Sequence, residues 1–173
     1  TTTGMTIDKD GHITKPLQAA FGAATNSTNI DTTTKRGTTE NLVFNVDSGN
    51  DGQFDVGSNF NTTTGKFTAP VAGKYIFYLK LQANSIYSGN NSWVLNAHFQ
   101  VNESGNFGNT YWTSGTSTSG TPAPYDVVEQ FVILNLAAND NVRVAISYES
   151  QATGTIETST NDGRCRFFGY LLG

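Results

Sequence analysis

The chain has 173 residues and a net charge of −4, because 14 aspartates and glutamates outnumber ten lysines and arginines. This acidic balance offers no counter-charge to a phosphate backbone, so we expect no nucleic-acid partner. The longest apolar runs have the length of a strand, well short of the roughly 20 residues that span a bilayer, so we also expect no membrane insertion.

The composition predicts a single all-β domain without a disulfide bond. Thr, Asn, Gly, Ser and aromatic residues are abundant, which favours short strands joined by polar turns. The only cysteine, Cys165, excludes an intrachain disulfide and a cysteine-based metal site. The length is sufficient for a hydrophobic core, so the burial of apolar side chains must supply the stability.

Residues 1–16 are predicted to form an N-terminal hairpin that connects to a domain over residues 17–173. Ile7 and Ile13 flank the turn from Asp8 to Gly11, and Pro16 starts a new direction. The chain begins without an initiator Met and without a basic-then-apolar leader. This predicts a fragment or a processed product of a longer protein.

The rest of the chain alternates between apolar segments and turns that contain Gly, Asn, Asp or Pro. Asn26 to Thr39 has almost no apolar side chains and is predicted to be a long surface loop. About ten strands over roughly 150 residues suit a two-sheet antiparallel jelly-roll sandwich. The predicted strands are Leu17–Phe21, Asn41–Val46, Gly52–Val56, Asn59–Asn61, Lys66–Ala69, Gly73–Ala83, Ser92–Val101, Val127–Leu136, Asn141–Tyr148, Thr155–Thr158 and Arg164–Leu172.

Alternation of polar and apolar residues predicts which strands face water. In Ser92–Val101 an apolar set that includes Phe99 alternates with Asn96, His98 and Gln100, so this polar side is expected to face water.

The strands Gly73–Ala83 and Arg164–Leu172 are apolar on both faces, which points to a partner subunit. Val127–Leu136 is also apolar on both faces in its second half, and the pattern alone does not place it. Tyr75, Phe77, Leu79 and Phe167 are predicted to fill the core. A sandwich has no second core for the opposite face, so that face is expected to bind another copy. A loop that folds over it is the alternative. The predicted interface residues are Ile76, Tyr78, Phe168, Tyr170 and Leu172.

The spacing Asp55-x4-Phe60-x6-Phe67-x5-Gly73-x-Tyr75-x-Phe77 resembles the signature of the globular head of complement C1q. The segments 64–75, 134–144 and 167–172 resemble further motifs of the same family. The resemblance implies a jelly roll of the C1q and tumour-necrosis-factor kind that assembles as a homotrimer. Three positions depart from the family pattern: Gly49 stands where the first Phe is expected, Leu79 replaces the last aromatic residue, and Asn139 replaces a glycine.

The segment from Met5 to Phe21 resembles the lead-in before C1q-like heads of phage and other viral fibre or virion proteins. This resemblance implies a non-enzymatic trimeric head in the virion that acts as a receptor-binding or adhesive tip. Its partners would be its own copies and a glycan or protein receptor on a cell surface. A secreted C1q-like protein that binds a protein or glycan and a purely structural capsid decoration module are the alternatives.

The sequence contains few residues and no motifs that indicate catalysis. His12 and His98 are the only histidines, and no nucleophile elbow or metalloprotease motif occurs. We therefore predict no catalytic residue, and we interpret His98 as a surface histidine and Cys165 as a packed thiol.

Aromatic residues beside polar turns are the candidate ligand-binding residues. Tyr111 and Trp112 precede a Gly-Ser-Thr run, Tyr125 follows two prolines, and Tyr87 lies in a polar turn. Aromatic faces with nearby amide and hydroxyl groups can stack on a sugar ring. Rings that anchor a long loop onto the sandwich are the alternative.

No cofactor is expected apart from calcium. Asp47, Asp51 and Asp55 lie on one acidic turn and could offer it several oxygen ligands. Ordinary turn chemistry is the alternative explanation.

Overall fold

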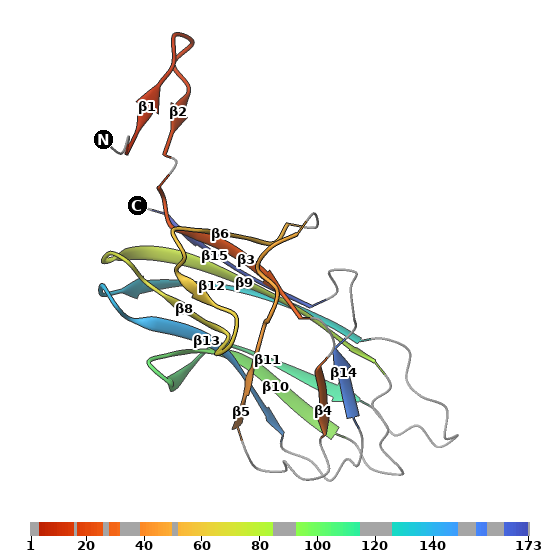
Figure 1. The fold of residues 1–173 in the computed structure, drawn as a ribbon. Coiled ribbons are helices and arrows are strands. Elements are labelled where there is room, and N and C mark those ends of the chain that lie inside the picture. The colour runs from red at the N-terminus through yellow and green to blue at the C-terminus, as the bar shows by residue number, and fades with distance from the viewer. Residues whose placement is uncertain are drawn as a thin grey trace.

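In a computed structural model of the chain, all regular elements of the described residues are β-strands, and every strand pair is antiparallel. A small hairpin projects from one end of a sandwich of two sheets (Figure 1). None of these residues forms a helix long and apolar enough to cross a membrane. The structure describes residues 4–15, 17–25, 28–31, 39–49, 52–84, 93–114, 126–148, 155–158 and 165–172.

The hairpin consists of β1 (Thr6–Ile7) and β2 (Ile13–Thr14), and Ile7 pairs with Ile13. One sheet of the sandwich has six strands in the order β11-β10-β13-β8-β7, with β5 also paired to β13. Its strands are β5 (Thr39–Leu42), β7 (Phe60–Asn61), β8 (Lys66–Thr68), β10 (Trp93–Val101), β11 (Ser104–Ser114) and β13 (Asn141–Tyr148).

The other sheet has seven strands in the order β4-β14-β9-β15-β3-β6, with β12 also paired to β9. The two layers confirm the predicted all-β antiparallel sandwich. The strands of this sheet are β3 (Ala20–Ala24), β4 (Thr28–Asp31), β6 (Phe54–Val56), β9 (Gly73–Asn84), β12 (Asp126–Leu136), β14 (Thr155–Thr158) and β15 (Arg166–Leu171).

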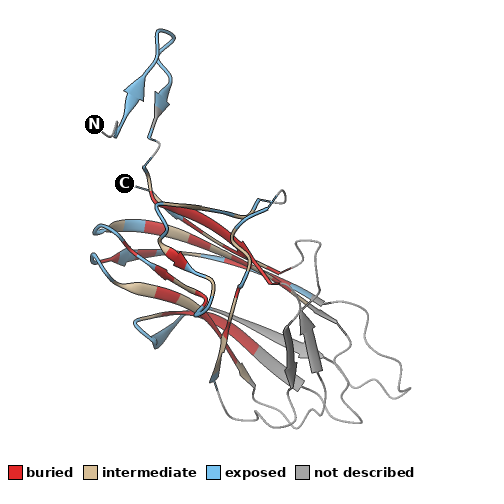
Figure 2. Ribbon diagram, in the orientation of Figure 1, coloured by how far each residue is buried: buried red, intermediate tan, exposed pale blue. Residues whose placement is uncertain are grey.

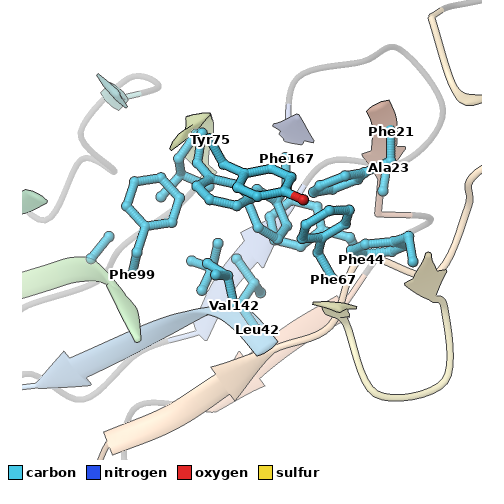
Figure 3. Close-up of a cluster of buried hydrophobic side chains, with 14 of the residues drawn as sticks. Phe21, Ala23, Leu42, Phe44, Phe67, Tyr75, Phe99, Val142 and Phe167 are labelled. Atoms are coloured by element: carbon cyan, nitrogen blue, oxygen red, sulfur yellow. The ribbon is translucent and has the colours of Figure 1, made fainter. Parts of the chain in front are cut away.

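Aromatic rings fill the space between the sheets, where buried residues of the two layers face each other (Figures 2 and 3). The ring of Phe21 stacks on Phe60 and Phe67, with centroids 4.6 and 4.9 Å apart. The edge of Phe167 meets Phe21 at 4.9 Å. Offset and edge-to-face pairs of this kind add to the stability that burial provides. Phe77 is fully buried among them, so the predicted register of β9 is correct.

Two stretches differ from the sequence expectation because pairing overrides weak local signals. The predicted loop from Asn26 to Thr39 contains β4, which pairs with β14. The Gly- and Asn-rich segment after Val101 forms β11, which pairs with β10 along its length. Where the register of this pair shifts, Gln130 Nε2 from the other sheet donates a hydrogen bond to the carbonyl of Ala97, 3.1 Å away.

The turn before β13 explains the replacement of the family glycine by Asn139. Asn139 has a φ of +72°, a left-handed conformation that asparagine tolerates better than most residues. Asp140 fixes the turn, since its carboxylate accepts a hydrogen bond from the Ala137 amide at 2.8 Å and another from Asn102 Nδ2 at 2.8 Å. These hydrogen bonds lower the pKa of the Asp140 carboxyl.

Candidate functional site

The outer surface of the seven-stranded sheet carries two apolar rows. Directly paired residues on adjacent antiparallel strands lie on the same side of the sheet, so the register defines each row. The first row consists of Phe131, Tyr78, Phe168, Gly22 and Phe54. The second row consists of Ile133, Ile76, Tyr170, Ala20 and Val56. We name these ten residues, together with Leu172, the outer apolar face.

Large side chains of this face are in contact with solvent. Phe131 is 69% exposed, Ile133 55% and Tyr170 46%. A contiguous exposed apolar patch of this kind marks an interaction surface, because single scattered apolar residues are normal but adjoining rows are not.

A charged row lies next to the first apolar row. Glu129, Lys80 and Arg166 are cross-strand neighbours, and Lys80 Nζ lies 3.6 Å from Glu129 Oε1. Burial, reinforced by the Glu129 carboxylate, raises the pKa of the Tyr78 hydroxyl above its ordinary 10. An apolar centre with a charged border is the usual anatomy of a protein interface.

The face also has a hollow of about 250 Å³. Its walls include Phe54, Ile76, Tyr78, Phe168 and Tyr170. Phe168 lies over Gly22, where a Cβ would come within 2.8 Å of the Phe168 ring. The hollow therefore has room for an apolar side chain of another molecule.

The structure brings the five predicted interface residues together on this face, and it adds Phe131, Ile133 and Phe54. A sequence signal for Phe131 and Ile133 was present, because β12 is apolar on both faces around residues 131–134. It could not be used, because the face of a strand is defined only once its paired neighbour is known.

Comparison with known proteins assigns the chain to a family. The model of the C1q domain matches residues 23–172. The chain belongs to the C1q domain family. Members are generally non-enzymatic binding modules, and they typically occur outside the cell. Among solved structures, the globular domain of zebrafish complement 1qA protein is similar, with a TM-score of 0.46 and 19% identity over 90% of this chain and 98% of that one. No curated protein matches the chain.

The aromatic ligand-binding candidates of this C1q domain are only partly within the described residues. Tyr111 and Trp112 lie in β11, opposite Asn96 and Leu95. The Gly-Ser-Thr run after Trp112 predicts a mobile loop from Tyr111 to Tyr125, and this prediction is wrong for Tyr111 and Trp112. Tyr87 and Tyr125 lie outside the described residues, so binding of a ligand by the four aromatic residues stays a prediction.

In the acidic turn, the Asp55 carboxylate accepts hydrogen bonds from backbone amides. Asp55 Oδ1 accepts a hydrogen bond from the Asn59 amide and Oδ2 from the Phe60 amide, each at 3.0 Å. Asp47 is half-buried, and Asp51 lies outside the described residues. Calcium binding by Asp47, Asp51 and Asp55 stays a prediction.

The hairpin brings together another group that could offer metal ligands. Ligand atoms of Asp8, Asp10 and His12 lie within 4.8 Å of one another. Their contacts are those of a tight turn, because Asp8 Oδ1 accepts hydrogen bonds from the amides of Asp10 and His12, each at 2.9 Å. Asp8 Oδ2 lies 2.8 Å from His12 Nδ1, which lowers the pKa of the Asp8 carboxyl.

A ladder of polar side chains on β10 is buried, so the prediction that this side faces water is wrong. Asn96, His98 and Gln100 are 3%, 1% and 8% exposed. Asn96 Oδ1 lies 2.8 Å from His98 Nδ1, and Gln100 Nε2 lies 3.4 Å from His98 Nε2. Arg143 Nε donates a hydrogen bond to Gln100 Oε1 at 2.9 Å. The partners satisfy a neutral imidazole, which donates from Nδ1 and accepts at Nε2.

This ladder should make stability depend on pH near neutrality. Burial, with the Arg143 charge as a second cause, lowers the pKa of His98 below its ordinary 6.5. The unfolded chain therefore takes up a proton before the folded chain does, so the free energy of unfolding should fall as the pH drops below about 6.5, until the folded-state pKa is reached. Urea unfolding at pH 7.5 and pH 5 measures this difference.

His98→Gln should reduce this pH dependence, because glutamine does not titrate. His12→Gln is the matched control at an exposed histidine and should keep the dependence. Both pH values lie above the ordinary carboxyl pKa values of 3.8 and 4.5, so carboxylate protonation contributes little. Equal wild-type stability at the two pH values would contradict the buried neutral histidine.

Proposed function

We propose that the chain is the non-enzymatic head of a homotrimer that assembles through the outer apolar face. The exposure of Phe131, Ile133 and Tyr170 on one face supports this most directly. Burying a large apolar side chain contributes about 1.5–3 kcal/mol, so several per copy are sufficient for obligate association. Trimers are typical of C1q domains, which fits this proposal.

We also propose that this trimer is the receptor-binding or adhesive tip of a viral fibre or virion protein. The lead-in from Met5 to Phe21 supports this setting. Three copies would multiply a weak affinity for a glycan or protein receptor on a cell surface. The coding sequence upstream of residue 1 distinguishes the alternatives: shaft repeats would favour a fibre, whereas a signal peptide with a Gly-X-Y stalk would favour a secreted C1q-like protein.

The trimer can be tested by light scattering with Phe131→Asp. The wild-type chain should have three times the monomer mass at micromolar concentration. Phe131→Asp should be a folded monomer, because its exposed position tolerates a charge in the single chain but not inside an apolar interface.

Val71→Asp is the matched control, since Val71 is 49% exposed and lies outside the outer apolar face. It should remain a trimer. A monomeric wild-type chain would overturn the proposal, and a trimeric Phe131→Asp variant would place the interface elsewhere.

A further inference from the structure

The N-terminal hairpin has an apolar stripe that this chain does not cover. Ile7 and Ile13 pair across the two strands and are 58% and 59% exposed. Met5, two residues before Ile7, is 54% exposed. Figure 2 shows the hairpin standing clear of the sandwich with exposed residues along both strands.

Local hydrogen bonds explain the tip of the hairpin but not the stripe. The Asp8 amide donates to the His12 carbonyl at 3.0 Å, and the Gly11 amide donates to the Asp8 carbonyl at 3.1 Å. These bonds close the turn and leave Met5, Ile7 and Ile13 in water. A two-stranded hairpin without a packed face is marginally stable, so burial of this stripe against a partner would stabilise it.

The stripe continues into the outer apolar face. A groove of about 610 Å³ begins at Ile13 and Lys15 and extends to Tyr170 and Leu172. Ala20 and Val56, both in the second apolar row, also line it. The hairpin leaves the sandwich at the end where the C-terminus lies (Figure 1). A molecule bound along the outer apolar face would therefore reach the base of the hairpin.

We propose that the hairpin stripe binds the same stripe of the other two copies, so that three hairpins form a short stem with its own apolar core. This inference rests on the proposed trimer. The symmetry that joins three outer apolar faces also brings together the three hairpins attached at their ends. Met5, Ile7 and Ile13 of each copy then fill the space around the threefold axis.

Cross-linking through an introduced cysteine tests the stem in the full chain. In an Ile7→Cys variant, two of the three cysteines should form an interchain disulfide under mild oxidation, because a disulfide requires Cα atoms about 4.4–6.8 Å apart. Thr6→Cys is the matched control on the other face of β1 and should cross-link several-fold less. The native Cys165 is buried and gives the same background in both variants.

A second measurement does not depend on oxidation. On dilution, the double variant Ile7→Thr with Ile13→Thr should dissociate at a protein concentration at least tenfold higher than that at which the wild type dissociates. Thr6→Ser should leave this concentration unchanged. The stem alone would be overturned by three results together. The wild type would be a trimer, the Ile7→Cys and Thr6→Cys variants would cross-link equally, and the double variant would dissociate at the same concentration as the wild type. A monomeric wild-type chain would overturn both the stem and the proposed trimer.

Discussion

Replacing Phe77 with alanine should lower the free energy of unfolding by about 3–5 kcal/mol. Phe77 is fully buried, and its ring centroid lies 5.7 Å from Phe67, 6.0 Å from Phe167 and 6.2 Å from Phe99. These neighbours come from both sheets, and paired strands hold their backbones in place. The cavity therefore cannot close fully. Urea unfolding at a fixed protein concentration measures the loss, since the stability of an oligomer depends on concentration.

Phe168→Ala provides the comparison, because Phe168 is the same residue type on the opposite face of the same sheet. It is only half-buried in the single chain. Compared with Phe77→Ala, Phe168→Ala should lower the folding stability of the single chain less and should weaken the association of the copies more. A neutral Phe77→Ala variant would show that the register of β9 is wrong.

Gly169→Ala should destabilise the fold strongly, with an expected loss of about 3 kcal/mol. Gly169 lies in β15 between Phe21 of β3 and Phe77 of β9. A Cβ at this position would come within 2.2 Å of Phe21 and 2.8 Å of Phe77. Aromatic rings that lean over a strand glycine protect its backbone and leave no room for a methyl group. Thermal unfolding monitored by near-UV circular dichroism reports both the loss and the changed ring packing.

Gly4→Ala is the matched control for this substitution. Gly4 has no atom within 4 Å of an added Cβ and no strained φ, so its replacement should leave the Tm unchanged. An unchanged Tm for Gly169→Ala would show that the two rings do not lie over this glycine.

The centre of the fold could be predicted from the sequence because β9 combines two independent signals. Its strict alternation separates Tyr75 and Phe77 from Ile76 and Tyr78, and the Pro70 and Gly73 turn fixes where the strand begins. The same alternation placed Phe168 on the outer side of β15, opposite Phe167. Where a strand is apolar on both faces, the pattern therefore predicts two contacts, although it does not name the partner.

Other features of the fold and of the candidate site depend on spatial neighbours that the sequence does not show. β11 is rich in Gly and Asn, and its pairing with β10 is what makes it a strand. His98 was predicted to face water because it is polar, yet hydrogen bonds from neighbouring side chains permit its burial. For the candidate site residue Trp112, the polar run that follows it predicted a loop, whereas pairing with β10 places it in β11.

The strand lengths given above also bear on how this protein avoids unwanted aggregation. On one side, the edge strands of the two sheets are short: β4, β5, β6 and β7 have four, four, three and two residues. Such short edges offer few free amide and carbonyl groups to an incoming strand. On the other side, the long strands β11 and β12 approach each other, and the Gln130 amide spans the gap between the sheets. Templated growth into fibrils through these edges is therefore disfavoured.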